Sequence, residues 1–247
     1  MKIVFSRKGF DSAAGGGPSP VLDGRPVTLP IPAGRGPSAT RYGALGLGEQ
    51  VALASRGRLG ADDFAHHDPM FLPDGRAMPN AILGQCGAAQ THLERQGVGV
   101  GDVFVFFGLF REGAAKPHHR LFAWLRVAEV LHLPSAPADR VAGLAKLGMP
   151  HALGLHAGND VAWLGQGGTA RRASAMLRLT VPEGPPSLWQ VPAWLHATGL
   201  SYHDKPGRWL PGNRLQSVSR GQEFVADVGQ RKDALDWVER VIAEMAN

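Results

Sequence analysis

Short apolar runs, rich in β-branched and aromatic residues, alternate along this chain with segments rich in glycine and proline. Such runs are typical of buried strands. They predict a short strand at residues 2–6, the strongest strand of the chain at 102–110, and a second long strand at 121–133 that pairs with it. Weaker runs predict strands at 162–164 and 175–181. The pattern therefore indicates a sheet.

Helical spacing of apolar residues is clearest in two segments. It predicts a helix at 84–96, which Gly97 ends, and an amphipathic C-terminal helix at 233–245. Residues 11–37 are rich in Gly, Pro and Ser, and predict a long loop with a brief strand at 27–31.

The order of these elements favours a mixed architecture. No internal repeat and no linker divides the sequence, so residues 1–247 are expected to form a single α+β domain. We expect a central antiparallel sheet with flanking helices.

The composition is that of a folded protein, with 44% hydrophobic and 19% charged residues. No apolar run approaches the 18 or so residues of a membrane-spanning helix, and the N-terminal apolar run is too short for a signal peptide. The single cysteine, Cys86, excludes an internal disulfide framework. These features predict a cytoplasmic protein without a membrane partner.

The net charge of +5 is concentrated in the first quarter of the chain. Residues 1–60 hold eight Lys and Arg against three acidic residues, whereas the remaining 187 residues hold 18 of each sign. A local excess of cations favours a polyanion, and it predicts contact with nucleic acid. The alternative is an ordinary solvated surface.

The segment from Ser6 to Asp11 combines two cations, a glycine and a carboxylate directly after a predicted strand. Arg7 and Lys8 are candidates to hold phosphate together with Ser6, and Asp11 is a candidate base, nucleophile or electrostatic partner. The alternative is a surface turn that the aspartate caps.

Histidine is frequent, with 10 residues, and several occur in pairs or near-pairs. Adjacent histidines on a strand point to opposite faces, and the sequence has no HExxH motif, so we expect no metal and no other cofactor. His67 and Asp68 lie before a proline that forbids helix continuation, and are a candidate acid/base pair.

Further side chains are candidates for contact with nucleic acid. Arg35 and Arg41 extend the basic region. Amides, imidazoles and aromatic rings suit the reading of a base edge or stacking on a base. The candidates for reading a base are Gln85, Gln90, His92, Tyr202 and Glu223.

Seven segments together follow the pattern of one known family: 6–12 (SRKGFDS), 15–20 (GGGPSP), 29–32 (LPIP), 67–69 (HDP), 84–90 (GQCGAAQ), 101–108 (GDVFVFFG) and 221–225 (GQEFV). In this order they resemble the third of the families called nucleotide-modification-associated domains, over nearly the whole chain. The resemblance implies a role around modified nucleobases in bacterial and phage DNA. The predicted strand pair is also similar to β-barrel halves of domains that read modified bases, so the sheet is expected to be partly barrel-like.

The resemblance and the charged segments together predict an enzyme that acts on modified bases in phage DNA, in a defence against phage, without an obligate protein partner. The expected reaction is that of a DNA glycosylase. Asp11 would stabilise the oxocarbenium-like sugar and activate water, with Lys8, His67 and Asp68 as further catalytic candidates. The base would leave the stack to be reached. The alternatives are a reader that binds a modified base without catalysis, and a transferase that decorates hydroxymethylated bases.

Overall fold

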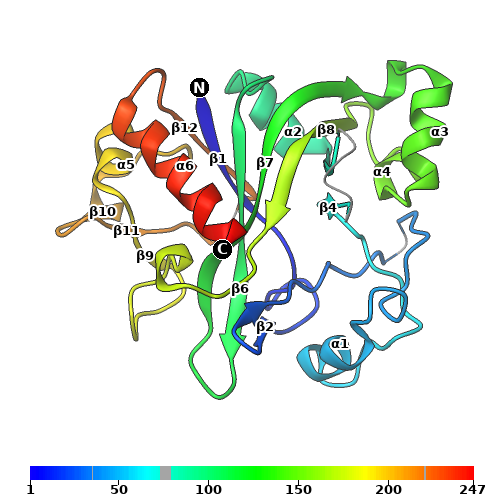
Figure 1. The fold of residues 1–247 in the computed structure, drawn as a ribbon, viewed down its shortest axis with the longest axis horizontal. Helices are drawn as coiled ribbons and strands as arrows, with labels where there is room; N and C mark the ends of the chain where they lie inside the picture. The colour runs from blue at the N-terminus through cyan, green and yellow to red at the C-terminus, as the bar shows by residue number, and fades with distance from the viewer. Residues whose placement is uncertain (35, 73–78, 220) are drawn as a thin grey trace.

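The computed structural model describes residues 1–34, 36–72, 79–219 and 221–247. A nine-stranded sheet forms its centre, with helices on both faces and at one edge (Figure 1). The strands of this sheet are β1 (Lys2–Arg7), β2 (Ser19–Leu22), β3 (Arg25–Pro26), β4 (Met70–Phe71), β5 (Ala81–Gln85), β6 (Val103–Glu112), β7 (His118–His132), β8 (Val161–Thr169) and β12 (Glu223–Asp227). A second, three-stranded sheet contains β9 (Leu188–Gln190), β10 (Trp209–Leu210) and β11 (Arg214–Gln216).

The helices cover the sheet and connect its strands. They are α1 (Gly48–Ser55), α2 (Gly87–Arg95), α3 (Ala138–Lys146), α4 (Pro150–Leu153), α5 (Ala193–Thr198) and α6 (Lys232–Ala246). Among the described residues, three short 3₁₀ helices lie between them: η1 (Leu133–Ser135), η2 (Ala175–Leu177) and η3 (Pro206–Arg208). The predicted α+β class is confirmed. None of the helices in the described ranges has both the length and the apolar character needed to cross a bilayer.

The principal path of the large sheet runs β12-β1-β6-β7-β8-β5-β4. Strand β1 pairs in parallel with β6 and antiparallel with β12, and β2 also pairs in parallel with β6. The remaining pairs of this sheet are antiparallel. The sheet is therefore mixed, with its antiparallel pairs in the majority.

Strand β6 carries no polar side chain from Val103 to Phe110 because both of its faces are buried there. Val105 and Phe107 belong to the same hydrophobic cluster as Val238 of α6, whereas Phe104 and Phe106 pack on the opposite side. A strand covered on both faces reads as a continuous apolar run rather than an alternating one. This burial explains why residues 102–110 gave the strongest strand signal.

The sheet curls strongly, so strands that are distant in sheet order approach each other. Gln85, at the end of β5, donates from Nε2 to Glu223 Oε1 at 2.6 Å, although β12 is at one end of the strand order and β5 is near the other. The expected partly barrel-like sheet is thus confirmed. The curl places the ends of β1, β5 and β12 around one site.

Two predicted strands and the start of one predicted helix are wrong. Residues 27–31 form no strand, since prolines on either side lack the N–H that a ladder needs. Residues 175–181 form η2 and isolated bridges instead of a strand. The helix predicted at 84–96 begins only at Gly87, because Gly84 and Gln85 pair with β8 as the end of a strand.

Candidate functional site

A cavity of about 530 Å³ opens where β1 and β5 end and β12 begins. Its wall combines the turn after β1, the loop before β4, the residues that follow β5, and α4 with the loop behind it. We call this cavity the pocket. Most of its charged and imidazole side chains come from segments that are far apart in the sequence.

The end of β1 directs Lys8 into the pocket. The Lys8 backbone N–H donates to the Phe107 carbonyl at 2.9 Å, and the chain then turns sharply at Gly9, whose φ is +83°. A Cβ at Gly9 would lie 2.9 Å from Thr28 Cγ2, so the turn requires glycine for space as well as for conformation.

Lys8 is held between two carboxylates, of which Asp68 also lines the pocket. Its Nζ lies 3.4 Å from Glu223 Oε1 and 3.9 Å from Asp68 Oδ2, and all three side chains are at most 11% exposed. Asp68 is fixed from its other side, because its Oδ1 accepts the Gly84 backbone N–H at 2.6 Å. We call Lys8, Asp68 and Glu223 the charged cluster.

Glu223 is the most buried member of the charged cluster. Ser6 Oγ donates to Glu223 Oε1 at 3.0 Å, beside the bond from Gln85, while Oε2 has no hydrogen-bond partner among the described residues. Burial raises the pKa of Glu223 above its ordinary value, and the ammonium of Lys8 opposes that rise. Groups perturbed in this way by burial and a specific charge are concentrated at functional sites.

Three imidazoles also line the pocket. The ring centroids of His151 and His156 are 4.3 Å apart, and that of His66 lies 5.3 and 5.4 Å from them. Burial, with the neighbouring cations and imidazoles, lowers the pKa of His66 to about 4 despite the nearby Asp68 carboxylate. We call His66, His151 and His156 the imidazole cluster.

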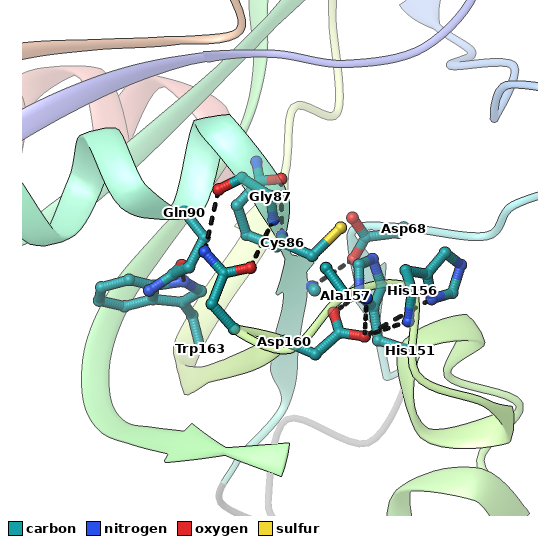
Figure 2. A network of polar contacts seen from close by, with 12 residues as sticks. Asp68, Cys86, Gly87, Gln90, His151, His156, Ala157, Asp160 and Trp163 are labelled. Atoms are coloured by element: carbon teal, nitrogen blue, oxygen red, sulfur yellow. Dashed lines mark hydrogen bonds and ion pairs between the residues drawn. The ribbon is translucent and has the colours of Figure 1, made fainter. Parts of the chain in front are cut away.

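Asp160 bonds two members of the imidazole cluster, His151 and His156 (Figure 2). It is fully buried directly before β8, and its Oδ1 bonds His151 Nδ1 while its Oδ2 accepts the backbone N–H of His156. Gly84 provides space for the ring, since a Cβ there would lie 2.2 Å from His151 Cδ2.

Cys86 also lines the pocket. In Figure 2 its sulfur points toward Asp68 and the two labelled histidines. Burial raises the pKa of the Cys86 thiol, and the carboxylate of Asp160 adds to that effect. A neutral thiol is a poor nucleophile, so the site offers carboxylate, ammonium and imidazole chemistry instead.

Several residues predicted from the sequence do meet here. Asp11, Arg7, Lys8, Asp68 and Gln85 all line the pocket. Asp11 Oδ1 accepts the backbone N–H groups of two residues of its own turn, both at 2.7 Å. The Arg7 guanidinium donates to two backbone carbonyls at 2.8 and 2.9 Å.

Other predicted residues contact the protein interior or lie elsewhere. Ser6 is fully buried, and Gln90 accepts a hydrogen bond from Trp163 Nε1 at 3.2 Å. His92 bonds Ser201 Oγ and packs on Tyr202, with ring centroids 4.3 Å apart.

His67, Gln90, His92 and Tyr202 are not part of the pocket wall within the described ranges. Burial lowers the pKa of His67. The Arg41 guanidinium is exposed and lies 4.3 Å from the centre of the Phe64 ring, whereas Arg35 is outside the described residues.

The imidazole cluster is the part of the site that sequence reasoning missed. His66 is 85 residues from His151, and the five-residue spacing of His151 and His156 matches neither one face of a helix nor one face of a strand. The approach of these rings depends on the loop before β4 folding against α4. The available local signal was the aspartate four residues after His156.

Comparison with known proteins agrees with the resemblance seen in the sequence. The model of the family described as nucleotide modification associated domain 3 matches residues 2–227 of the 247-residue chain. No match was found among curated proteins or among solved structures. The matched range includes the pocket, the charged cluster and the imidazole cluster. The chain therefore belongs to the nucleotide modification associated domain 3 family.

Proposed function

We propose that this protein is a hydrolase that takes a modified nucleotide of DNA into the pocket and cleaves its N-glycosidic bond. The observation that carries the proposal is the charged cluster, in which Lys8 and Asp68 lie together in the wall of a cavity of about 530 Å³. A role in modified-base biology is consistent with the family to which the chain belongs.

The dimensions of the pocket suit a nucleotide taken out of the base stack. Its volume falls within the roughly 300–1,000 Å³ of small-molecule sites, which leaves room for a base with a substituent. Enzymes that perform chemistry on a base extrude it into such a cavity. The amide of Gln85 is engaged by Glu223 and by the Cys86 N–H, so the exposed Gln222 and Gly221 on the wall are the residues that would supply polar contacts for a base edge.

Asp68 is our preferred catalytic carboxylate. As the bond between the sugar C1′ and the base nitrogen breaks, its electron pair leaves with the base and positive charge develops on the sugar. Asp68 stabilises that charge and accepts a proton from the water whose oxygen bonds to C1′. Lys8 supplies a positive charge near the departing base, while Glu223 holds Lys8 in place.

Asp11, the first carboxylate suggested by the sequence, is the second choice. Its Oδ1 is engaged by two backbone N–H groups of its own turn, an arrangement that a purely structural aspartate would also have. Asp68 also accepts one backbone N–H, but it lies beside a buried ammonium as well, and a buried ion pair adds little stability over apolar packing.

The test is incubation of purified protein with phage DNA that carries glucosylated or hydroxymethylated bases and with unmodified DNA, followed by mass spectrometry of released bases. We expect the wild type to release a modified base. Asp68→Asn should lower the rate by at least about 100-fold while DNA binding survives, since a transition-state charge is lost. Asp11→Asn, which leaves the charged cluster intact, is the matched comparison.

Three results would contradict this mechanism. Full activity in Asp68→Asn, together with its loss in Asp11→Asn, would move the catalytic role to Asp11. Binding of modified DNA without release would identify a reader. A gain in mass of the base when a sugar donor is supplied would identify a transferase.

A further inference from the structure

We propose that the imidazole cluster binds one divalent transition-metal ion of the zinc type, with an open coordination position facing the pocket. The ligands are His66, His151 and His156. This inference concerns metal binding and does not depend on the hydrolase proposed above.

The first argument is the convergence of the three rings. One ring nitrogen from each residue can be chosen so that all three atoms lie within 4.8 Å of one another. Nitrogens that share a tetrahedral zinc, each about 2.0–2.1 Å from the metal, are about 3.3 Å apart. Side-chain rotation on metal binding would have to close that difference.

The second argument is the support behind His151. Its Nδ1 bonds the buried carboxylate of Asp160, which leaves Nε2 as the nitrogen available to a metal. Ligating histidines are commonly oriented by a carboxylate in this way, which fixes the tautomer and raises the basicity of the ligand nitrogen. The same aspartate positions the backbone of His156, so one residue serves two of the three ligands.

The third argument is that packing alone does not account for the arrangement. If His151 had only a structural role, its hydrogen bond with Asp160 would be sufficient. Within the described part of the chain, His66 makes no side-chain hydrogen bond, yet its ring packs edge-on against both partners. In addition, residue 84 must be glycine for the His151 ring to fit. Three imidazoles brought together at a pocket wall are better explained by a shared ligand.

The donor set indicates the class of metal. Neutral imidazoles suit zinc and its neighbours in the first transition row, whereas magnesium and calcium prefer oxygen ligands. Three protein ligands and an open fourth position are typical of a catalytic zinc, and a structural zinc has four protein ligands. Because all three histidines line the pocket, the open position would be accessible to water or to a donor atom of a bound base.

A second ligand set shares His151. Cys86, His151 and Asp160 also have donor atoms within 4.8 Å of one another. We prefer the three imidazoles, because Asp160 is already engaged by His151 and by two backbone N–H groups. The two sets predict different spectra, since a thiolate bound to cobalt gives a charge-transfer band that imidazoles do not give.

The experiment is titration of chelator-treated full-length protein with Zn²⁺ by calorimetry and with Co²⁺ by absorption spectroscopy, both without DNA. We expect one ion per chain and a tetrahedral cobalt spectrum without a thiolate band. His66→Gln and His156→Gln should each weaken binding by more than about 100-fold. Asp160→Asn should weaken it by about 10–100-fold, as for other outer partners. His132→Gln, an exposed histidine at the end of β7, is the matched control and should bind as the wild type does.

Circular dichroism of each metal-free variant shows whether a loss of binding reflects a lost ligand or a lost fold. The ligand substitutions are made at His66 and His156, which are less buried than His151, so that the test does not depend on a variant of the buried residue. Absence of binding by the wild type, or equal binding by His156→Gln and His132→Gln, would overturn the proposal. A thiolate band that Cys86→Ala abolishes would overturn the ligand set. Because base release is not measured here, failure of the proposed hydrolase leaves these outcomes unchanged.

Discussion

Replacing Lys8 with methionine should show how far the stability of the folded protein depends on the lysine of the charged cluster. Methionine keeps most of the length of the lysine side chain and removes its charge. The change leaves two poorly exposed carboxylates, Asp68 and Glu223, without the ammonium that lies 3.9 and 3.4 Å from them. Glu223 would retain its hydrogen bonds from Ser6 and Gln85.

The expected loss of stability is large. Removing one partner of a buried ion pair typically costs about 3–5 kcal/mol, because the remaining charge stays buried without compensation. For a chain of this size 1 kcal/mol changes the midpoint of thermal unfolding by about 2–4 °C. Lys8→Met should therefore lower the midpoint by roughly 6–20 °C near pH 8.

The loss should depend on pH in a defined direction. The pKa of Glu223 is raised in the folded protein, so its contribution to stability is greatest below the pKa of about 4.3 of an unfolded glutamate and decreases as the pH rises. Without Lys8 that pKa rises further. The difference between wild type and Lys8→Met should accordingly widen from pH 5 to pH 8.

Thermal and urea unfolding at pH 5 and pH 8 check this prediction, with Lys116→Met as the matched control. Lys116 pairs with Glu183 at 3.3 Å, but both side chains are mostly exposed, so this substitution should cost no more than about 1 kcal/mol. Adding Glu223→Gln to Lys8→Met should restore at least half of the lost stability at pH 8. Equal effects of the two lysine substitutions, or no restoration by the glutamine, would refute the assignment of Glu223 as a buried charge that needs Lys8.

Three further substitutions test other parts of the site. Gly84→Ala should destabilise the protein by about 1–3 kcal/mol, measured by urea unfolding, because its Cβ would overlap the His151 ring; unchanged stability would show that the ring has room to move. Gln90→Leu should cost about 1–3 kcal/mol by leaving the Trp163 indole N–H unpaired, while the affinity for modified DNA stays the same; a selective loss of that affinity would instead support Gln90 as a base reader. Arg41→Ala should lower the slope of log affinity against log salt by up to about 1 in a fluorescence anisotropy titration with DNA, and an unchanged slope would exclude a phosphate contact by this residue.

The sheet was predictable where burial is continuous along the chain. Strand β6 from Val103 to Phe110 and strand β7 from Leu121 to Leu125 carry no polar side chain because the sheet is covered on both faces there, and this property is local in sequence. The end of β5 was not predictable in the same way. Only Cys86 separates Gly84 and Gln85 from α2, and the small residues around it suit a helix start as well as a strand end.

The candidate site was predictable only in part, for a physical reason. Lys8, Asp68 and Glu223 could be identified individually, since each adjoins a strand end or a turn, and the curl of the sheet then joins them. The meeting of His66 with His151 depends on tertiary contact between two loops, which no local spacing encodes. The excess of positive charge in residues 1–60 predicts phosphate contacts by Arg7 and Lys8. In the structure, however, both side chains are engaged by the protein's own oxygens.

The last two residues of β5 connect the two halves of the site. Gln85 donates to Glu223, and thereby supports the charged cluster from one direction. Gly84 donates its N–H to Asp68 and leaves the space that the His151 ring fills. A small displacement of this strand end would therefore change the geometry of the carboxylates and of the imidazole cluster together. A β5 variant that changes both metal affinity and base release would therefore not show that the metal takes part in the reaction. His156→Gln and Asp68→Asn are the informative substitutions, because each alters one half of the site.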